Sequence, residues 1–167
     1  GFQQYRANTS MASAMDGVID IEERISMALR WRGGTETAVN MVMGAAVTSD
    51  SVLAEQYNAK VKAIIGDIAK IQEKIVAEAT QPDEKASVDK VLVARKAVMA
   101  ATAKTWELKG AGDVVETQRF ADDQFAPLIT SYLKSQDDFV AVLQKRRDAV
   151  RAAVNERRVS YAVQGLA

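Results

Sequence analysis

The sequence contains no cysteine and no histidine. The absence of cysteine excludes disulfides, thiolate nucleophiles and iron–sulfur clusters. The absence of histidine removes the side chain that most often serves as general base and metal ligand, and with it c-type haem sites and the Glu-x-x-His pairs of ferritin-like bundles. No glycine-rich phosphate loop is present either. We therefore expect no enzyme activity, no metal and no cofactor.

Helix-breaking residues are scarce, since only two prolines and nine glycines occur in 167 residues. Ala, Val, Lys, Glu and Gln are abundant, which favours an all-α protein. Lys and Arg together number 22, as do Asp and Glu, so the formal net charge is zero. A chain without net positive charge lacks the electrostatic signature of nucleic-acid binding. Nucleic acid is therefore not an expected partner.

Long apolar runs are absent as well. No stretch has the length and apolar character of a transmembrane helix or the apolar run of a signal peptide. The chain begins with Gly1 rather than Met, and its 167 residues suit one domain with a hydrophobic core. We expect residues 1–167 to form a single domain excised from a larger protein.

Breakers and capping residues divide the chain into four predicted helices. The first runs from about residue 8 or 14 to 47, and the polar stretch 48–51 then supplies N-caps for the second, over about 52–79. Pro82 suits the first turn of a third helix, which continues to about 109 and stops at the glycine-containing loop 110–112. Asp113 and Glu116 have capping-box spacing and begin a fourth helix that continues to about 161.

Apolar residues recur in each helix at alternating spacings of three and four, as at Val18, Ile21 and Ile25. Such stripes on four helices with short loops predict an antiparallel up-down-up-down four-helix bundle with long first and fourth helices. The middle helices of about 28 residues span about 42 Å, whereas the fourth has nearly 50 residues. The first and fourth helices therefore project together, as in a domain anchored to a membrane. A frayed or crossing C-terminal helix is the alternative.

Most helix breakers inside the predicted helices share one height in the bundle. Positions on different helices can be compared by the number of residues that separate them from the two distal turns, near residues 49 and 111. By this count one layer of the bundle contains Gly33, Gly34, Gly66 and Pro127. An interior glycine costs ~1 kcal/mol and an interior proline ~3 kcal/mol of helix stability. Their clustering indicates close backbone approach or room around a bound molecule. Close helix packing without a ligand is the alternative.

Polar residues interrupt the apolar stripes in the same layer. Arg32 and Thr35 occupy consecutive stripe positions in the first helix, and Arg95 interrupts the stripe of the third. An arginine that faces the interior needs a carboxylate, a carbonyl or a bound molecule as its partner. Glu36 is the internal alternative, because an ion pair with Arg32 or Arg95 would satisfy either arginine without a ligand.

A second polar group lies nearer the distal turns, where Asn40, Thr102 and Arg119 have similar heights. Guanidinium, hydroxyl and amide groups bind carboxylates, and apolar neighbours exclude water. A threonine hydroxyl can instead bond to its own helix, which is the alternative for Thr102. We therefore predict a binding site for a small organic acid or amino acid. The predicted ligand-binding residues are Trp31, Arg32, Thr35, Asn40, Arg95, Thr102, Arg119 and Phe125.

Four segments carry a family resemblance: "ERISMALRWRGGTETAVNMVMG", "ELKGAGDVVE", "FAPLITSYLKSQDDF" and "VNERR". With them the chain resembles the periplasmic four-helix-bundle ligand-binding domain of methyl-accepting chemotaxis proteins, the fold of the bacterial aspartate and serine receptors. Where the aspartate receptor carries pocket arginines on its first helix, this chain has Glu36 and Asn40 in two of the places. The ligand stays open among amino acids, di- and tricarboxylates and aromatic acids.

The resemblance implies the periplasmic domain of an inner-membrane chemoreceptor, flanked by transmembrane helices and paired as a homodimer. In such receptors the ligand shifts the fourth helix and signals across the membrane to a kinase-control region. The site lies either within one bundle or between protomers, and the output domain is a chemotaxis signalling domain, a kinase or a cyclase. The alternative function is a structural amphipathic bundle, phasin-like or bound to a lipid surface, without a specific small ligand.

Overall fold

The computed structural model describes the backbone of residues 2–165 and the side chains of residues 11–165. The prediction of an all-α protein is confirmed. The first helix begins at residue 2, before either predicted start, while the other observed ends lie within about two residues of the predicted ones. The elements are α1 (Phe2–Val47), α2 (Ser51–Glu78), α3 (Pro82–Gly110), α4 (Val114–Phe120), the π-helical turn η1 (Ala121–Phe125) and α5 (Ala126–Val163).

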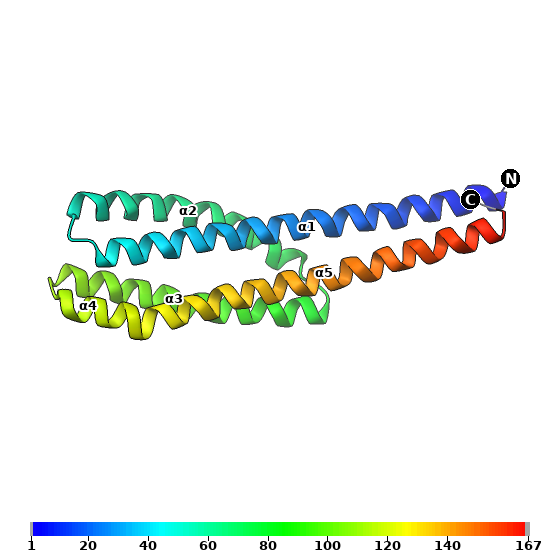
Figure 1. The fold of residues 1–167 in the computed structure, drawn as a ribbon. Helices are drawn as coiled ribbons and strands as arrows, with labels where there is room; N and C mark the ends of the chain where they lie inside the picture. The colour runs from blue at the N-terminus through cyan, green and yellow to red at the C-terminus, as the bar shows by residue number, and fades with distance from the viewer. Residues whose placement is uncertain (1, 166–167) are drawn as a thin grey trace.

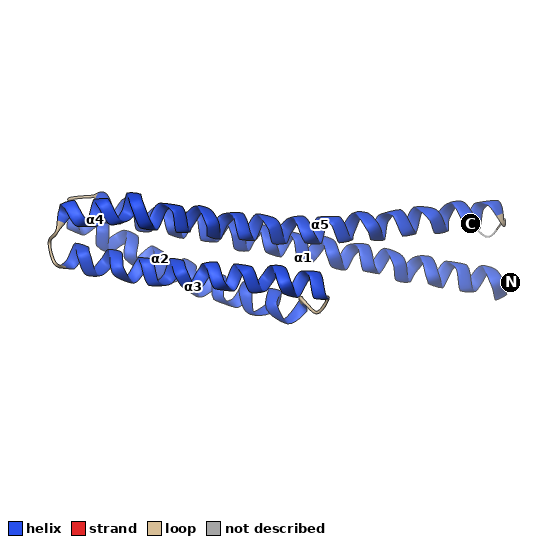
Figure 2. Ribbon diagram, turned by 90° about the horizontal axis from the view of Figure 1, so that it is seen from below, coloured by secondary structure: helices blue, strands red, loops and turns tan. Residues whose placement is uncertain are grey.

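The helices lie side by side, and the chain reverses direction at the turns after α1, α2 and α3 (Figure 1). Helices α1 and α5 have 46 and 38 residues, against 28 in α2 and 29 in α3. Both long helices extend beyond the α2–α3 turn, and the two chain ends lie at the same end of the molecule (Figure 2). None of the helices described by the structure is long and apolar enough to cross a membrane.

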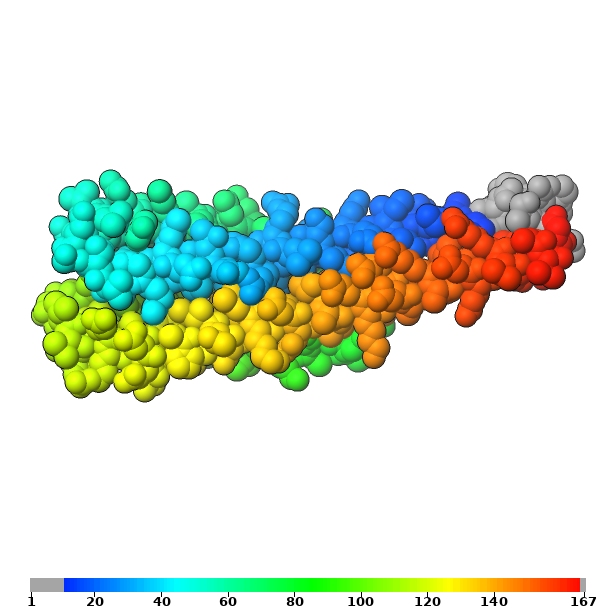
Figure 3. Space-filling model, in the orientation of Figure 1, coloured from blue at the N-terminus to red at the C-terminus, as the bar shows by residue number. Residues whose placement is uncertain are grey.

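The projecting parts of α1 and α5 stay in contact, as the space-filling view shows (Figure 3). Arg147 and Arg151 of α5 both form ion pairs with Glu22 of α1, with 3.8 Å between Arg147 Nε and Glu22 Oε1. Gly17 faces Val150, where a Cβ built on the glycine would lie 4.0 Å from Val150 Cγ1. The two long helices therefore form a continuous pair beyond the shorter helices.

Polar caps start the helices near the positions that the sequence predicts. The Asp50 carboxylate accepts hydrogen bonds from the backbone N–H groups of Val52 and Leu53, both at 3.0 Å. Pro82 lies in the first turn of α3, where its missing N–H has no helical partner to lose. Asp113 accepts a hydrogen bond of 3.1 Å from the backbone N–H of Glu116 and thereby caps α4.

The predicted fourth helix is not uninterrupted, because the π turn η1 separates α4 from α5. In this turn the backbone N–H of Ala126 donates to the carbonyl oxygen of Ala121, five residues back. Pro127 explains the change, since proline has no N–H and its ring clashes with the carbonyl four residues back in a regular helix. A π turn widens the backbone and relieves this clash.

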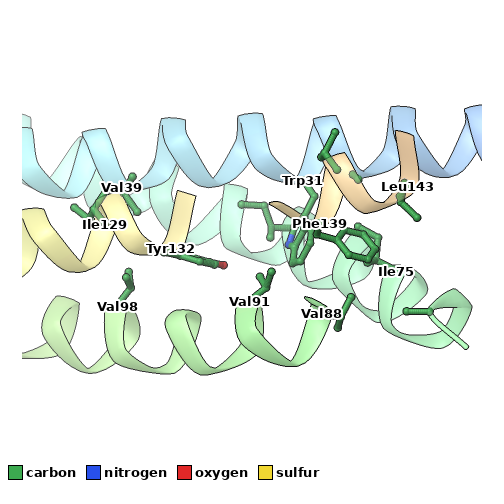
Figure 4. Packing of buried hydrophobic residues seen from close by; sticks show 14 of the residues in the cluster. Trp31, Val39, Ile75, Val88, Val91, Val98, Ile129, Tyr132, Phe139 and Leu143 are labelled. Atoms are coloured by element: carbon green, nitrogen blue, oxygen red, sulfur yellow. The ribbon is translucent and has the colours of Figure 1, made fainter. Parts of the chain in front are cut away.

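Large apolar side chains from α1 and α5 fill the middle of the bundle. Trp31 and Phe139 are almost fully buried, and their rings pack edge to face with centroids 6.1 Å apart. Ile75 of α2 and Val88 of α3 lie close to this pair (Figure 4). Burying each of these side chains stabilises the fold by about 1.5–3 kcal/mol. The aromatic pair therefore packs α1 against α5, on the chain-end side of Thr35.

The glycines of the predicted layer do not share one cause. A Cβ at Gly34 would lie 3.1 Å from Ile68 Cγ1, so α1 and α2 approach closely there. Gly33 and Gly66 are exposed, and no atom lies within 4 Å of a Cβ built on either. Neither close packing nor an interior site therefore requires glycine at these two positions. Close packing of α1 against α2 explains Gly34, and the π turn accommodates Pro127.

A buried carboxylate joins all four helices near the α2–α3 turn. The Glu84 side chain of α3 is only 1% exposed and forms ion pairs with Arg24 of α1 and with Arg146 of α5, the latter at 2.9 Å between Nε and Oε2. The Arg146 N–H is not aligned for a hydrogen bond there. Arg24 Nε also lies 3.4 Å from Glu78 Oε2 of α2, and Arg146 Nη2 lies 2.7 Å from Asp83 Oδ1. Because an uncompensated buried carboxylate is strongly unfavourable, this network fixes the turn against both long helices.

We expect Glu84→Gln to lower the free energy of unfolding by ~2–4 kcal/mol, because two partly buried arginines lose the carboxylate between them. The loss stays moderate since Arg24 keeps Glu78 and Arg146 keeps Asp83. Asp89→Asn, an exposed position on the same helix, is the matched control and should change stability by less than ~0.5 kcal/mol. Urea unfolding followed by circular dichroism measures both, and equal effects would contradict this role of Glu84.

Candidate ligand-binding site

A cavity of about 50 Å³ lies inside the bundle, bounded by α1, α2, α3 and α5. Helices α2 and α3 make few close backbone contacts with each other, and Met99 on this side is 40% exposed. The cavity therefore opens to solvent between α2 and α3. Most of its wall is apolar and is formed by Val39, Val42, Val61, Ile65, Ile68 and Val98.

The polar side chains at one end of the cavity come from three helices. Thr35 lines it from α1, Arg95 from α3 and Tyr132 from α5. Helices α1 and α3 run in the same direction (Figure 1), so Thr35 and Arg95 both lie toward the chain ends. Val42 and Thr102, two helical turns further along the same helices, line the opposite end. The cavity is thus polar at one end and mainly apolar at the other.

Tyr132 extends from α5 into the interior, with its hydroxyl on the side of Val91 (Figure 4). Burial raises the pKa of its phenol, although a hydrogen bond with Thr35 and the positive charge of Arg95 act in the opposite direction. The phenol is therefore neutral at ordinary pH, and its hydroxyl can donate a hydrogen bond. Gln136, one turn along α5, donates from Nε2 to Thr35 Oγ1 at 3.0 Å. This chain of contacts holds Thr35 and Tyr132 in place.

Arg95 is half-buried at the cavity and forms no ion pair with any side chain of residues 11–165. Its neighbours three and four positions away on α3 are Val, Leu, Val and Met, so its own helix offers no carboxylate. The other partly buried arginines among the described residues differ, since all contact carboxylates: Arg24, Arg32, Arg146 and Arg147. A guanidinium without a carboxylate partner beside two hydroxyl groups can bind an anion.

Three of the eight predicted ligand-binding residues line the cavity: Thr35, Arg95 and Thr102. The Thr102 hydroxyl donates to the carbonyl oxygen of Val98 at 2.8 Å, which is the alternative foreseen for it. Its hydrogen is therefore engaged with its own helix, and Thr102 presents mainly its methyl group and oxygen lone pairs. Arg95 and Thr35 are the predicted residues with polar groups at the other end.

Arg32 does not face the interior, so the prediction that it lies on the buried stripe is wrong. Its guanidinium lies at the edge between α1 and α5, where Nε donates to Asp137 Oδ1 at 2.9 Å. It also forms an ion pair with Glu36 one turn ahead, the carboxylate that the sequence predicted as a partner in place of a ligand. The fully buried Trp31 occupies the stripe position instead, because the interior takes the larger apolar side chain.

The remaining predicted residues lie outside the cavity lining. Asn40 is exposed on α1, and Arg119 is exposed on α4, where it pairs with Glu116 at 2.6 Å. Trp31 and Phe125 are fully buried parts of the hydrophobic core. These four side chains therefore do not converge with Thr35 and Arg95.

Two polar residues of the site were not predicted, Tyr132 and Gln136. Tyr132 continues the spacings of three and four from Phe125 and Leu128, and its phenol combines an apolar ring with a polar tip. Gln136 follows it by four residues and precedes the buried Phe139 by three, which is helical stripe spacing. A search for polar side chains at such spacings would have found both.

No protein-family model matches the chain, and no curated protein matches it. Among the residues that the structure describes, no group of three or more carboxylates could hold a metal ion. The cavity lining also pairs no hydroxyl with a general base.

We expect the pH dependence of stability to report the burial of Tyr132. A folded-state pKa raised above the ordinary value of 10.0 means that the unfolded chain loses this proton first. The unfolding free energy should therefore fall as the pH rises above about 10, by at most ~1.4 kcal/mol per pH unit from this group. Urea unfolding in alkaline buffers should show a shallower fall for Tyr132→Phe than for the unmodified chain. Identical slopes would contradict the burial of a titrating phenol here.

Proposed function

We propose that this chain is the extracytoplasmic ligand-binding domain of a bacterial chemoreceptor, an antiparallel up-down-up-down four-helix bundle with long first and fourth helices. In this proposal the interior cavity binds a small organic acid and the bundle signals across the inner membrane by a shift of α5. The observation that carries the proposal is Arg95, a half-buried guanidinium at the cavity without a carboxylate partner among the described residues. A bound carboxylate would supply the missing charge.

The position of Tyr132 supports a signalling role. A carboxylate held at the polar end of the cavity would contact side chains of α1, α3 and α5 together. Binding would therefore favour one position of α5 relative to α1, and only such a difference in binding can shift a conformational equilibrium. Both helices extend side by side beyond the turn near Glu84 (Figure 2), which supplies a route toward flanking transmembrane helices.

The resemblance described above supports the remaining parts of the proposal. It places the domain in the periplasm, anchored by transmembrane helices on both sides and paired as a homodimer. In this proposal the site lies within one bundle, where Thr35, Arg95 and Tyr132 line the cavity. Output through a chemotaxis signalling domain, a kinase or a cyclase is compatible with it.

The buried polar contacts favour a sensor over a structural bundle that opens on lipid surfaces. The contact between Gln136 and Thr35 and the ion pairs of Glu84 each join different helices. Opening the bundle onto an apolar surface would separate these partners and leave polar groups without hydrogen bonds. A bundle made to open would be expected to carry fewer such contacts.

A thermal-shift screen of carboxylic and amino acids tests the proposal. An acid present at about 100 times its dissociation constant should raise the melting temperature by ~5–10 °C. Arg95→Met should abolish the shift, because the side chain keeps an unbranched apolar stem but loses its charged guanidinium. Arg32→Met is the matched control, since Arg32 lies outside the cavity, and should leave the shift intact. Absence of any shift, or a shift that survives Arg95→Met, would count against the proposal.

A further inference from the structure

The charges that line the cavity limit the kind of acid that it can hold. Among its lining residues Arg95 is the one charged side chain, and neither aspartate nor glutamate contributes. A second carboxylate on the bound molecule would find no cation inside. An ammonium group would find no anion and would have to be desolvated without a partner. The lining therefore disfavours dicarboxylates and α-amino acids.

The size of the cavity limits the acid further. A volume of about 50 Å³ has room for about three or four water-sized groups. Tricarboxylates and aromatic acids are bulkier than this. A small carboxylate with a short hydrocarbon chain matches it, once the flexible Met99 side chain at the mouth adjusts.

The two ends of the cavity match the two ends of such a molecule. Arg95, Thr35 and Tyr132 offer a guanidinium and two hydroxyl groups at the end toward the chain termini. Val42 and Val61 present only hydrocarbon toward the distal turns. A short carboxylate chain with its oxygens at Arg95 would bury its methyl end against these valines, so that charge and hydrocarbon each meet a suitable surface.

Resting on the proposed function, we infer that the cavity binds a short-chain monocarboxylate of about three to five carbons. Its carboxylate lies against Arg95 and accepts a hydrogen bond from Tyr132, and its hydrocarbon chain points toward Val42 and Val61. It enters between α2 and α3, past Met99. This assignment separates the domain from sensors of amino acids and of di- or tricarboxylates.

Isothermal titration with n-butyrate tests the inference. Three compounds of the same chain length are the controls: 2-aminobutyrate adds an ammonium group, succinate adds a second carboxylate, and butyramide removes the charge. We expect saturable binding of n-butyrate with one site per chain, and binding of the three controls weaker by at least ~10-fold.

Two substitutions place the binding at Arg95. Arg95→Met should weaken n-butyrate binding ~10- to 100-fold, and Arg95→Lys should keep part of it because the positive charge remains. Arg32→Met should bind n-butyrate like the unmodified chain. Circular dichroism and thermal melting check that each variant is folded, and Arg95→Lys alone decides the question if Arg95→Met does not fold.

The outcomes distinguish this inference from the proposed function. If 2-aminobutyrate or succinate binds as tightly as n-butyrate and depends on Arg95, the inference fails while an acid sensor remains. If none of these acids binds, the inference fails, and the proposed function fails with it only if the thermal-shift screen also finds no acid that binds. If n-butyrate binds equally well to both Arg95 variants, the assignment of the cavity is overturned.

Discussion

The ion pairs around Glu84 set the geometry on which the rest of the bundle depends. This carboxylate is buried at the start of α3, so it requires the cations that α1 and α5 bring to it. Meeting that requirement fixes the α2–α3 hairpin against both long helices at one end. At the other end, caps such as Asp50 and Asp113 fix the distal turns. The structure leaves a cavity in the interior between these two ends, where Arg95 has no carboxylate partner among the described side chains.

One face of α5 connects the cavity with the Glu84 network. Tyr132, Gln136, Phe139, Leu143 and Arg146 follow one another at spacings of four and three, and the first four are buried. Tyr132 lines the cavity and Arg146 contacts Glu84 about 21 Å further along the helix. A small displacement of α5 at the cavity would therefore act on the ion pairs that hold α5 to the α2–α3 turn. In the proposed function, this face is the physical route from ligand to membrane.

The sequence predicted the ends of the helices well because local chemistry decides them. Asp50, Pro82 and Asp113 act within one turn of their own helices, and their roles need no knowledge of tertiary contacts. Thr35 and Arg95 were also predicted at the interior, since polar residues that interrupt an apolar stripe are visible from spacing alone.

The misplacement of Arg32 and the omission of Gln136 share one physical origin. Between Ala28 and Thr35, either Trp31 or Arg32 can be the residue on the buried face of the helix. Spacings of three then four and of four then three both keep residues on one helical face, so the sequence does not distinguish them. The same ambiguity lies between Ser135 and Gln136 on the way from Tyr132 to Phe139. Packing against neighbouring helices decides each case: Trp31 is buried against Phe139, and Gln136 is buried against Thr35. Information of this kind is not present in one helix alone.

The central claim is that the Arg95 guanidinium is the receptor for a carboxylate. Nuclear magnetic resonance of arginine side-chain Nε–H groups, with the Arg95 signal assigned from Arg95→Lys, tests it directly during a titration with n-butyrate. The account predicts that the Arg95 resonance shifts saturably while those of Arg24 and Arg32, already paired with carboxylates, stay nearly unchanged. An unchanged Arg95 resonance at n-butyrate concentrations that saturate the protein would contradict it.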